Sequence, residues 1–361
     1  MNTIKKNQHY IPKFYLRNFS YQNNKKQIGI YNIFNEVFYK SAQLKHQGSK
    51  NFFYGYDGKI EDKLSDIEGK LARVIRDIIL TKRVPIKESD YYYDLLLLIV
   101  LTDVRNPISI EGFKNMLLEM RNQIIKMDPH SDIDNLVPSP NHDEVIKLLF
   151  ATISNILPMM VDLDYKLIIN KTTTSFITSD LPIVKYNQYL EKKKWKFPMS
   201  GYGLTGLQIL IPINKELMVI FFDKDIYKVG DKKKKFLNVT SMQNIDDLNK
   251  LQFLNCLGTL YFDDSIDESY IRKLHYLAKN HERAHMTKSV VGFLIKEGDE
   301  ENKRIIESGF KNLMMINKTD CLTNLQVEGI KIHSKGRLNK LNETLAQERP
   351  HVSRHRNLNR S

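Results

Sequence analysis

The chain has 361 residues, of which 42% are hydrophobic and 10% aromatic, so it can bury a substantial core and is not a disordered polypeptide. Lys and Arg outnumber Asp and Glu by 55 to 42, and the net charge of +13 favours anionic partners, of which nucleic acid is the commonest. A Lys-rich composition without such a partner explains the same charge, and composition alone does not choose between these explanations.

Cysteine usage and hydropathy indicate where the chain works. Cys256 and Cys321 lie outside any CxxC pattern, which argues against a disulfide framework and for a reducing compartment. The first residues contain no apolar signal segment. The strongest apolar run, residues 95–101, is much shorter than the ~20 residues that a membrane span needs. We therefore expect a cytoplasmic protein without a membrane partner.

The first half of the chain predicts an arm, a hairpin and helices. Residues 7–20 concentrate aromatic rings and cations, and we expect them to form an arm packed across the body of the protein. Alternating apolar residues predict a hairpin over residues 27–42. Apolar residues at helical spacing then predict four helices, over residues 60–78, 91–106, 111–127 and 143–160.

After Asp162 the apolar period falls to two, which is typical of strands. Four short β-rich runs, as in an antiparallel sheet, cover residues 165–170, 175–180, 207–213 and 217–223. Helical patterns return over residues 244–262 and 267–285, and a last strand is predicted over residues 289–295. This order predicts an α+β fold with a helical bundle, an antiparallel sheet and the N-terminal arm packed across them.

We expect a single α+β domain over residues 1–330 and a basic, mobile tail over residues 331–361. The domain is divided by pattern into an arm and hairpin (1–58), a helical part (59–161), a β-rich part (162–240) and C-terminal helices with a strand (241–330).

Two short motifs match known sites but lack the context that those sites need. Residues 281–285 match the HExxH zinc pattern, yet Arg283 would place a permanent cation beside the metal. Gly201, Gly203 and Gly206 match the dinucleotide pattern GxGxxG, yet a predicted strand follows instead of a helix. We interpret the first as a solvated helix end and the second as a turn into the sheet.

Two lysine clusters lie in predicted connections of the β-rich part, where an antiparallel sheet could bring them together. Lysines neutralise phosphates without reading bases, and a tryptophan can stack on a base. Two solvated loops are the competing interpretation. The candidate nucleic-acid-binding residues are Lys192, Lys193, Lys194, Trp195, Lys232, Lys233, Lys234 and Lys235.

Three segments occur in the order found in one bacterial family: QHYIPKFYLRNFS near the N-terminus, IEDKLSDIEGKLARVI after an aromatic turn, and FITSDLPIV followed by ILIPINKEL. The chain resembles the DUF4238 family over roughly residues 7–285. The resemblance implies a cytosolic, mainly prokaryotic protein, often suspected of acting in nucleic-acid conflict or phage defence. It supplies no catalytic assignment, but it favours treating five residues as parts of one constellation: His9, Arg17, Glu68, Arg105 and Asp180.

These side chains suit phosphodiester chemistry. His9 titrates near neutral pH and can transfer a proton or bind a metal. Arg17 and Arg105 can each grip a phosphate through two hydrogen bonds. Carboxylates for Mg²⁺ or Mn²⁺, or for a general base, come from Glu61, Glu68 and Asp180.

We therefore expect a cytosolic nucleic-acid-acting effector, specifically a metal-dependent nuclease in prokaryotic defence, with the five-residue constellation as its catalytic site. The alternative is a non-catalytic nucleic-acid-binding or sensor protein in which the same residues form a structural network between arm and body. Asp180 illustrates the choice, since a carboxylate at a strand end also caps local N–H groups in an Asx turn. Asp103 and Arg105 end a buried helix and need partners, because burying an unpaired charge costs several kcal/mol.

Overall fold

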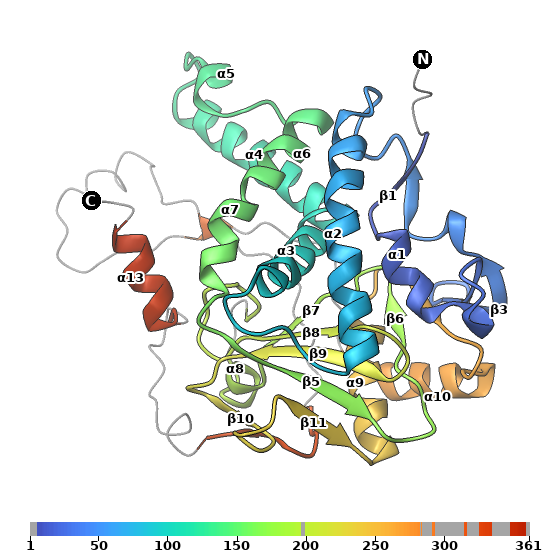
Figure 1. Cartoon of the computed structure of the whole chain (residues 1–361). Coiled ribbons are helices and arrows are strands. Elements are labelled where there is room, and N and C mark those ends of the chain that lie inside the picture. The colour runs from blue at the N-terminus through green and yellow to red at the C-terminus, as the bar shows by residue number, and fades with distance from the viewer. Residues whose placement is uncertain are drawn as a thin grey trace.

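The computed structural model describes residues 6–195, 199–281, 283, 291–292, 314–315, 325–333 and 347–358. Its architecture is α+β, as predicted (Figure 1). The helices of the first half stand on one side of a five-stranded sheet, two later helices lie on its other side, and the N-terminal arm with its hairpin flanks them.

Helices form in the first half where apolar residues recur at helical spacing and polar side chains cap the ends. Ser89, Asn106 and Asn141 each accept a backbone N–H bond at a helix start. Pro107 occupies the first turn after Asn106, where its missing N–H is not needed. The helix predicted over residues 143–160 is divided into two. The helices are α1 (Lys13–Leu16), α2 (Lys59–Thr81), α3 (Asp90–Val104), α4 (Pro107–Met127), α5 (Ile133–Leu136), α6 (His142–Ala151) and α7 (Ile153–Ile156).

The five-stranded sheet has apolar residues on both faces, which explains the continuous apolar runs of its central strands. Leu167 packs in the core that includes α2 and α3, and its neighbour Ile168 packs on the opposite face in the core that includes α9 and α10. The order is β11-β5-β9-β8-β7, and only the β11–β5 pair is parallel, so the sheet is mixed where we predicted an antiparallel one. Its strands are β5 (Asp164–Asn170), β7 (Val184–Tyr186), β8 (Gln208–Pro212), β9 (Leu217–Phe222) and β11 (Phe236–Val239).

A second sheet, of order β3-β2-β12-β6, joins three distant parts of the chain. The predicted hairpin supplies β2 (Gln27–Asn32) and β3 (Val37–Gln43). The run predicted over residues 175–180 supplies the short strand β6 (Thr178–Ser179), and β12 (Thr259–Phe262) lies in the segment predicted to be helical over residues 244–262. The helix there, α9 (Met242–Asn255), ends before Gly258, and the chain turns back as a strand.

Shorter elements complete the described chain: β1 (Asn7–His9) paired with β4 (Ser49–Asn51), α8 (Gln188–Lys192), β10 (Tyr227–Val229) paired with β15 (Ile330–Ile332), α10 (Glu268–Ala278), β13 (Val291–Gly292) paired with β14 (Met314–Met315), and α13 (Pro350–Leu358). None of the helices in the described ranges has the length and apolar character that crossing a membrane requires.

The described part of the predicted mobile tail is anchored to the body. Arg349, which is 2% exposed, donates from Nε to Asp162 across 2.8 Å and from Nη1 to the Leu204 carbonyl. We predicted a mobile tail from the basic composition of these residues, but the buried ion pair between Arg349 and Asp162 fixes the start of α13. Most of the HExxH match over residues 281–285 lies outside the described residues, and α10 ends before it, at Ala278.

Candidate functional site

The N-terminal arm packs across the body through its aromatic residues, as predicted. The Tyr15 hydroxyl donates to the Pro212 carbonyl of β8 across 2.7 Å, and Tyr15 itself is fully buried. The N–H groups of Tyr10 and Ile11 both donate to the Gly48 carbonyl. Gly48 has a φ of +59°, and a Cβ there would lie 2.8 Å from Ile11 Cβ, so only glycine fits this close approach. The arm is therefore held in one fixed position.

Arg105 pairs with Glu68, and its charge contributes to the lowered pKa of His9 in the arm. Arg105 follows α3, is fully buried, and donates from Nη1 to Glu68 Oε1 of α2 across 3.0 Å. Its Nε and Nη2 have no hydrogen-bond partner among the described residues. His9 Nε2 lies 3.2 Å from the Lys45 carbonyl. Burial first, then the charges of Lys13 and Arg105, lower the pKa of His9 to about 4, so the imidazole is neutral near pH 7.

Asp180 forms its hydrogen bonds with a different part of the chain. Its Oδ1 accepts the Leu257 N–H across 2.7 Å, and its Oδ2 accepts the N–H groups of Gly258 and Thr259, each across 2.8 Å. Burial raises the pKa of Asp180 to about 6, against the three hydrogen bonds that favour the charged form. The carboxylate thus caps the turn between α9 and β12, which is distant in sequence, instead of a local Asx turn.

Two of the three carboxylates predicted to bind Mg²⁺ or Mn²⁺ are engaged by other groups of the protein. Glu68 is engaged by Arg105, and both oxygens of Asp180 accept backbone N–H bonds. Glu61 lies in the first turn of α2. Within the described ranges, no three His, Cys, Asp or Glu side chains form a group that could hold a metal ion.

Asp103 is the other charged residue at the end of α3 that we predicted to need a partner, and the structure supplies two. Asp103 Oδ2 accepts from Lys185 Nζ across 2.6 Å and from the Tyr202 hydroxyl across 2.7 Å. Both partners of Asp103 are protein side chains, and Lys185 belongs to β7. The contact therefore joins α3 to β7 and is structural.

The sheet topology separates the two lysine clusters that we expected to converge. Lys192 ends α8, which follows the edge strand β7, whereas residues 232–235 precede β11 at the opposite edge. Lys235 Nζ is paired with Asp164 across 2.8 Å. Trp195 is partly buried against the core below the sheet. The clusters do not form one surface, because the order of strands, which local pattern does not reveal, places them apart.

Arg17 is the one member of the predicted constellation that faces solvent, and it lies in a groove. A cavity of about 530 Å³ is lined by the cations Lys13, Arg17, Lys25, Lys26 and Lys45, together with Asn24, Gln27, Gln43 and Leu44. No carboxylate lines it. We call this cavity the cationic half of the arm groove.

An adjoining cavity of about 520 Å³ shares Arg17 and Lys25 with the first and adds a third exposed cation, Arg76. Its remaining lining is mainly apolar: Phe14 of α1 and Ala72, Ile75, Ile79 and Leu80 of α2, with Asn18 and Asn23 at the rim. We call it the apolar half of the arm groove. The shared residues make the two halves neighbours.

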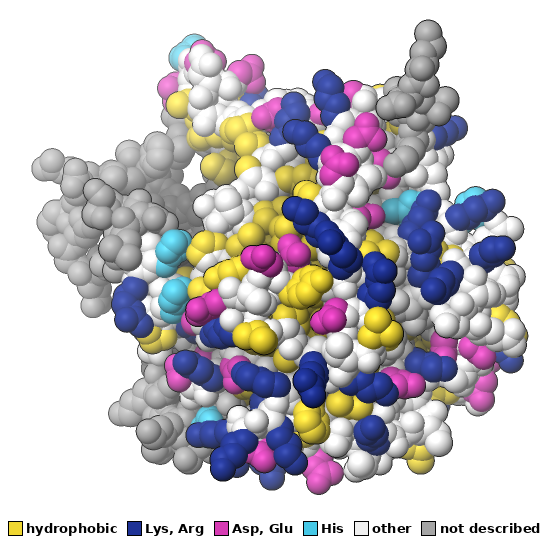
Figure 2. Space-filling model, in the orientation of Figure 1, with side chains coloured by type: hydrophobic (Ala, Val, Ile, Leu, Met, Phe, Trp, Pro, Cys, Tyr) yellow, Lys and Arg dark blue, Asp and Glu magenta, His cyan; other side chains and the backbone are white. Residues whose placement is uncertain are grey.

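The described residues do not neutralise the cations of the arm groove. Lys13, Arg17, Lys25, Lys26, Lys45 and Arg76 form no ion pair with any carboxylate in the described part of the chain. Figure 2 shows Lys and Arg side chains gathered over the region of α2, α1 and the neighbouring hairpin. Unpaired like charges held together favour an anionic partner.

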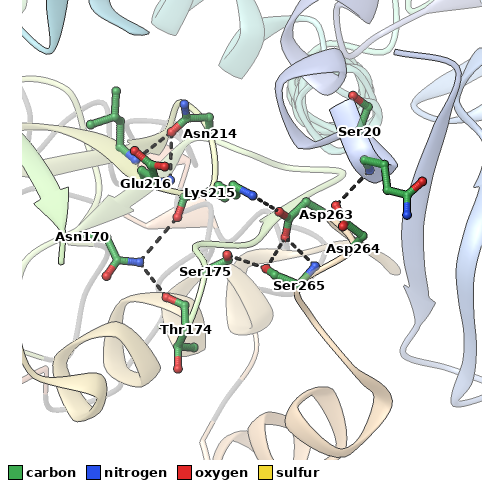
Figure 3. Close-up of polar contacts among 12 residues, drawn as sticks. Ser20, Asn170, Thr174, Ser175, Asn214, Lys215, Glu216, Asp263, Asp264 and Ser265 are labelled. Carbon is green, nitrogen blue, oxygen red and sulfur yellow. Dashed lines mark hydrogen bonds and ion pairs between the residues drawn. The ribbon is translucent and has the colours of Figure 1, made fainter. Parts of the chain in front are cut away.

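A third cavity, of about 370 Å³, adjoins the apolar half and has the opposite character. Asp263 pairs with Lys215 across 3.0 Å and accepts from the Ser265 hydroxyl across 2.6 Å (Figure 3). Asp264 accepts the Gln22 N–H across 2.9 Å. These carboxylates have structural partners, and they give the groove an acidic end.

Sequence analysis did not identify the cationic half, because its lysines are brought together by the pairing of two strands. Gln27 pairs with Gln43 in the β2–β3 hairpin, and the Leu44 N–H donates to the Lys26 carbonyl across 2.9 Å. This pairing puts Lys26 beside Lys45 at the open end of the hairpin. With the register of the hairpin known, the basic pairs Lys25-Lys26 and Lys45-His46 would have predicted this cluster.

Residues 7–265 match the family model of DUF4238, whose description is a protein of unknown function. The match covers well over half of the chain. The chain belongs to the DUF4238 family. No curated protein and no solved structure matches it. The DUF4238 region contains the arm, the whole arm groove, Arg105 and Asp180, whereas α13 lies outside it.

Proposed function

We propose that this DUF4238 protein binds nucleic acid in the arm groove, and that its buried His/Arg/carboxylate network serves the fold. The observation that carries the proposal is a set of six cations that line the two neighbouring halves of the groove and have no carboxylate partner in the described part of the chain; Arg17 and Lys25 line both halves. Each cation that contacts a phosphate releases condensed counterions, which is the main source of sequence-independent affinity.

Binding is better supported than cleavage. The residues lining the two halves of the groove include no His, Cys, Asp or Glu, so no general base or metal ligand adjoins the place where phosphates would lie. His9, Arg105 and Asp180 are all buried, with exposures of 6%, 0% and 4%. The nuclease hypothesis needs these groups beside Arg17 at an open surface. We therefore favour a non-catalytic nucleic-acid-binding or sensor protein, acting in the prokaryotic cytoplasm and in defence.

A charge-reversal experiment tests the proposal. The double variant Arg17→Glu/Lys25→Glu is compared with Lys192→Glu/Lys233→Glu, which changes the net charge equally but alters residues outside the groove. Affinity for labelled single-stranded and double-stranded oligonucleotides is measured by fluorescence anisotropy. We expect the groove variant to lose at least about tenfold in affinity and the control to lose about twofold or less.

Equal losses in the two double variants would mean that binding follows net charge, and the groove assignment would be abandoned. Absence of binding by the wild-type chain to either kind of oligonucleotide would end the proposal altogether. Thermal unfolding midpoints confirm that each variant is folded, which we expect because the four substituted side chains are exposed.

A further inference from the structure

The two halves of the arm groove offer different chemistry to one ligand. On α2, Ala72, Ile75, Arg76, Ile79 and Leu80 recur at helical spacing and form one stripe facing the groove. Leu80 is 76% exposed, so part of this stripe is open to solvent. The Phe14 ring of α1 lines the same cavity and is only partly buried, unlike the neighbouring Tyr15. An apolar surface with an aromatic ring therefore adjoins the cationic half directly.

Phosphates alone would occupy only one half of this groove. A duplex presents phosphates outward and keeps its base faces stacked inside, so it would leave the Phe14 surface empty. An unpaired nucleotide carries both a planar, largely apolar base and a phosphate, and bases stack on aromatic rings and on arginine guanidinium planes. Arg17 and Arg76 line the cavity beside Phe14 and supply such planes.

Resting on the proposed function, we infer that the arm groove selects single-stranded nucleic acid, with an unpaired base on Phe14 in the apolar half and the flanking phosphates on the cationic half. The third cavity offers phosphates no free cation among its lining residues, because its Lys215 is paired with Asp263. The strand therefore leaves the apolar half toward Lys26 and Lys45.

The rim of the groove is held in place before any ligand binds. Asn23 and Lys25 have φ values of +53° and +57°, in the left-handed region that non-glycine residues rarely adopt. Ser20 Oγ accepts the Lys25 N–H across 3.2 Å, and Asp264 accepts the neighbouring Gln22 N–H. Backbone held in such a conformation by specific contacts is typical of binding loops. A fixed rim lowers the entropy lost on binding.

The test compares three ligands of the same backbone length: a single strand, the matched duplex, and a single strand of abasic residues that keeps the phosphates and lacks bases. We expect the wild-type chain to bind the normal single strand about tenfold more tightly than the abasic strand. Phe14→Leu, which keeps an apolar side chain but removes the ring, should lose most of that preference while its affinity for the abasic strand is unchanged. Phe34→Leu is the matched control, because Phe34 is exposed and lies outside the groove.

Equal affinity for the normal and abasic strands, or a preference that Phe14→Leu leaves intact, would overturn the inference about single strands. The proposed function would still stand in that case if Arg17→Glu/Lys25→Glu weakened all three ligands. If that double variant bound all three ligands as the wild type does, the groove would not be the binding site, and both claims would fall.

Discussion

Arg105 donates from Nη1 to Glu68 Oε1 across 3.0 Å and so joins the end of α3 to the middle of α2 beneath the N-terminal arm. The guanidinium is fully buried, and the carboxylate side chain is 27% exposed. Since Arg105 stays protonated, Glu68 is the group that balances a charge held away from water. The charge of Arg105 also reaches the arm, where it contributes to lowering the pKa of His9.

Glu68→Gln should destabilise the chain. Removing one partner leaves the buried guanidinium uncompensated, and we expect a loss of roughly 2–3 kcal/mol in the free energy of unfolding, below the value for a fully buried pair because Glu68 is partly exposed. Urea denaturation measures the loss. Glu111→Gln, at an exposed position of α4, is the matched control and should change stability by about 0.5 kcal/mol or less. Equal stability of the two variants would show that the pair contributes nothing.

The pH dependence of stability should reveal His9. Its folded pKa of about 4 lies below the ordinary value of 6.5, so the unfolded chain binds the proton first as pH falls. The contribution of a neutral His9 is therefore fully present above pH 6.5 and is lost as pH falls towards 4. We expect the wild type to lose about 1–3 kcal/mol relative to His9→Gln across this window. Parallel stability curves for the two proteins would show that His9 titrates normally in the folded chain.

Asp180 should act in the opposite direction over nearly the same window. Its folded pKa of about 6 exceeds the ordinary value of 3.8, so the folded chain binds the proton more tightly. The contribution of Asp180 to the free energy of unfolding is fully present below pH 3.8. It falls by roughly 3 kcal/mol as pH rises through 6. The cost of Asp180→Asn should consequently shrink between pH 4 and pH 7, which chemical denaturation at a series of pH values would measure. A cost that grows with pH would mean that the three backbone N–H bonds outweigh burial.

Local pattern was enough to predict the longer helices, the β2–β3 hairpin and the central strands β5, β8 and β9. The spacing of Ile60, Leu64 and Leu71 predicted α2, and Pro107 marked the boundary between α3 and α4. Pairing between distant segments was not readable. The parallel contact of β11 with β5 and the pairing of β6 with β12 depend on the packing of the whole chain.

The candidate site was only partly predictable, because it too depends on contacts between distant segments of the chain. The family resemblance suggested that His9, Glu68 and Arg105 belong together, and the structure pairs Arg105 with Glu68. It could not reveal that Arg17 points outward, because a helical arm distributes neighbouring side chains around its axis. Nor could it reveal the shared groove of Lys25 and Arg76, which belong to different elements brought together only by folding.

The salt dependence of binding tests the central claim most directly. For a single strand, the slope of log K against log salt is about −0.7 per neutralised phosphate, so six groove cations predict a slope as steep as about −4. Arg17→Ala/Lys25→Ala should reduce its magnitude by about 1.4, whereas Lys192→Ala/Lys233→Ala should leave it unchanged. A slope that is the same in the wild type and the groove variant would contradict phosphate binding in the arm groove.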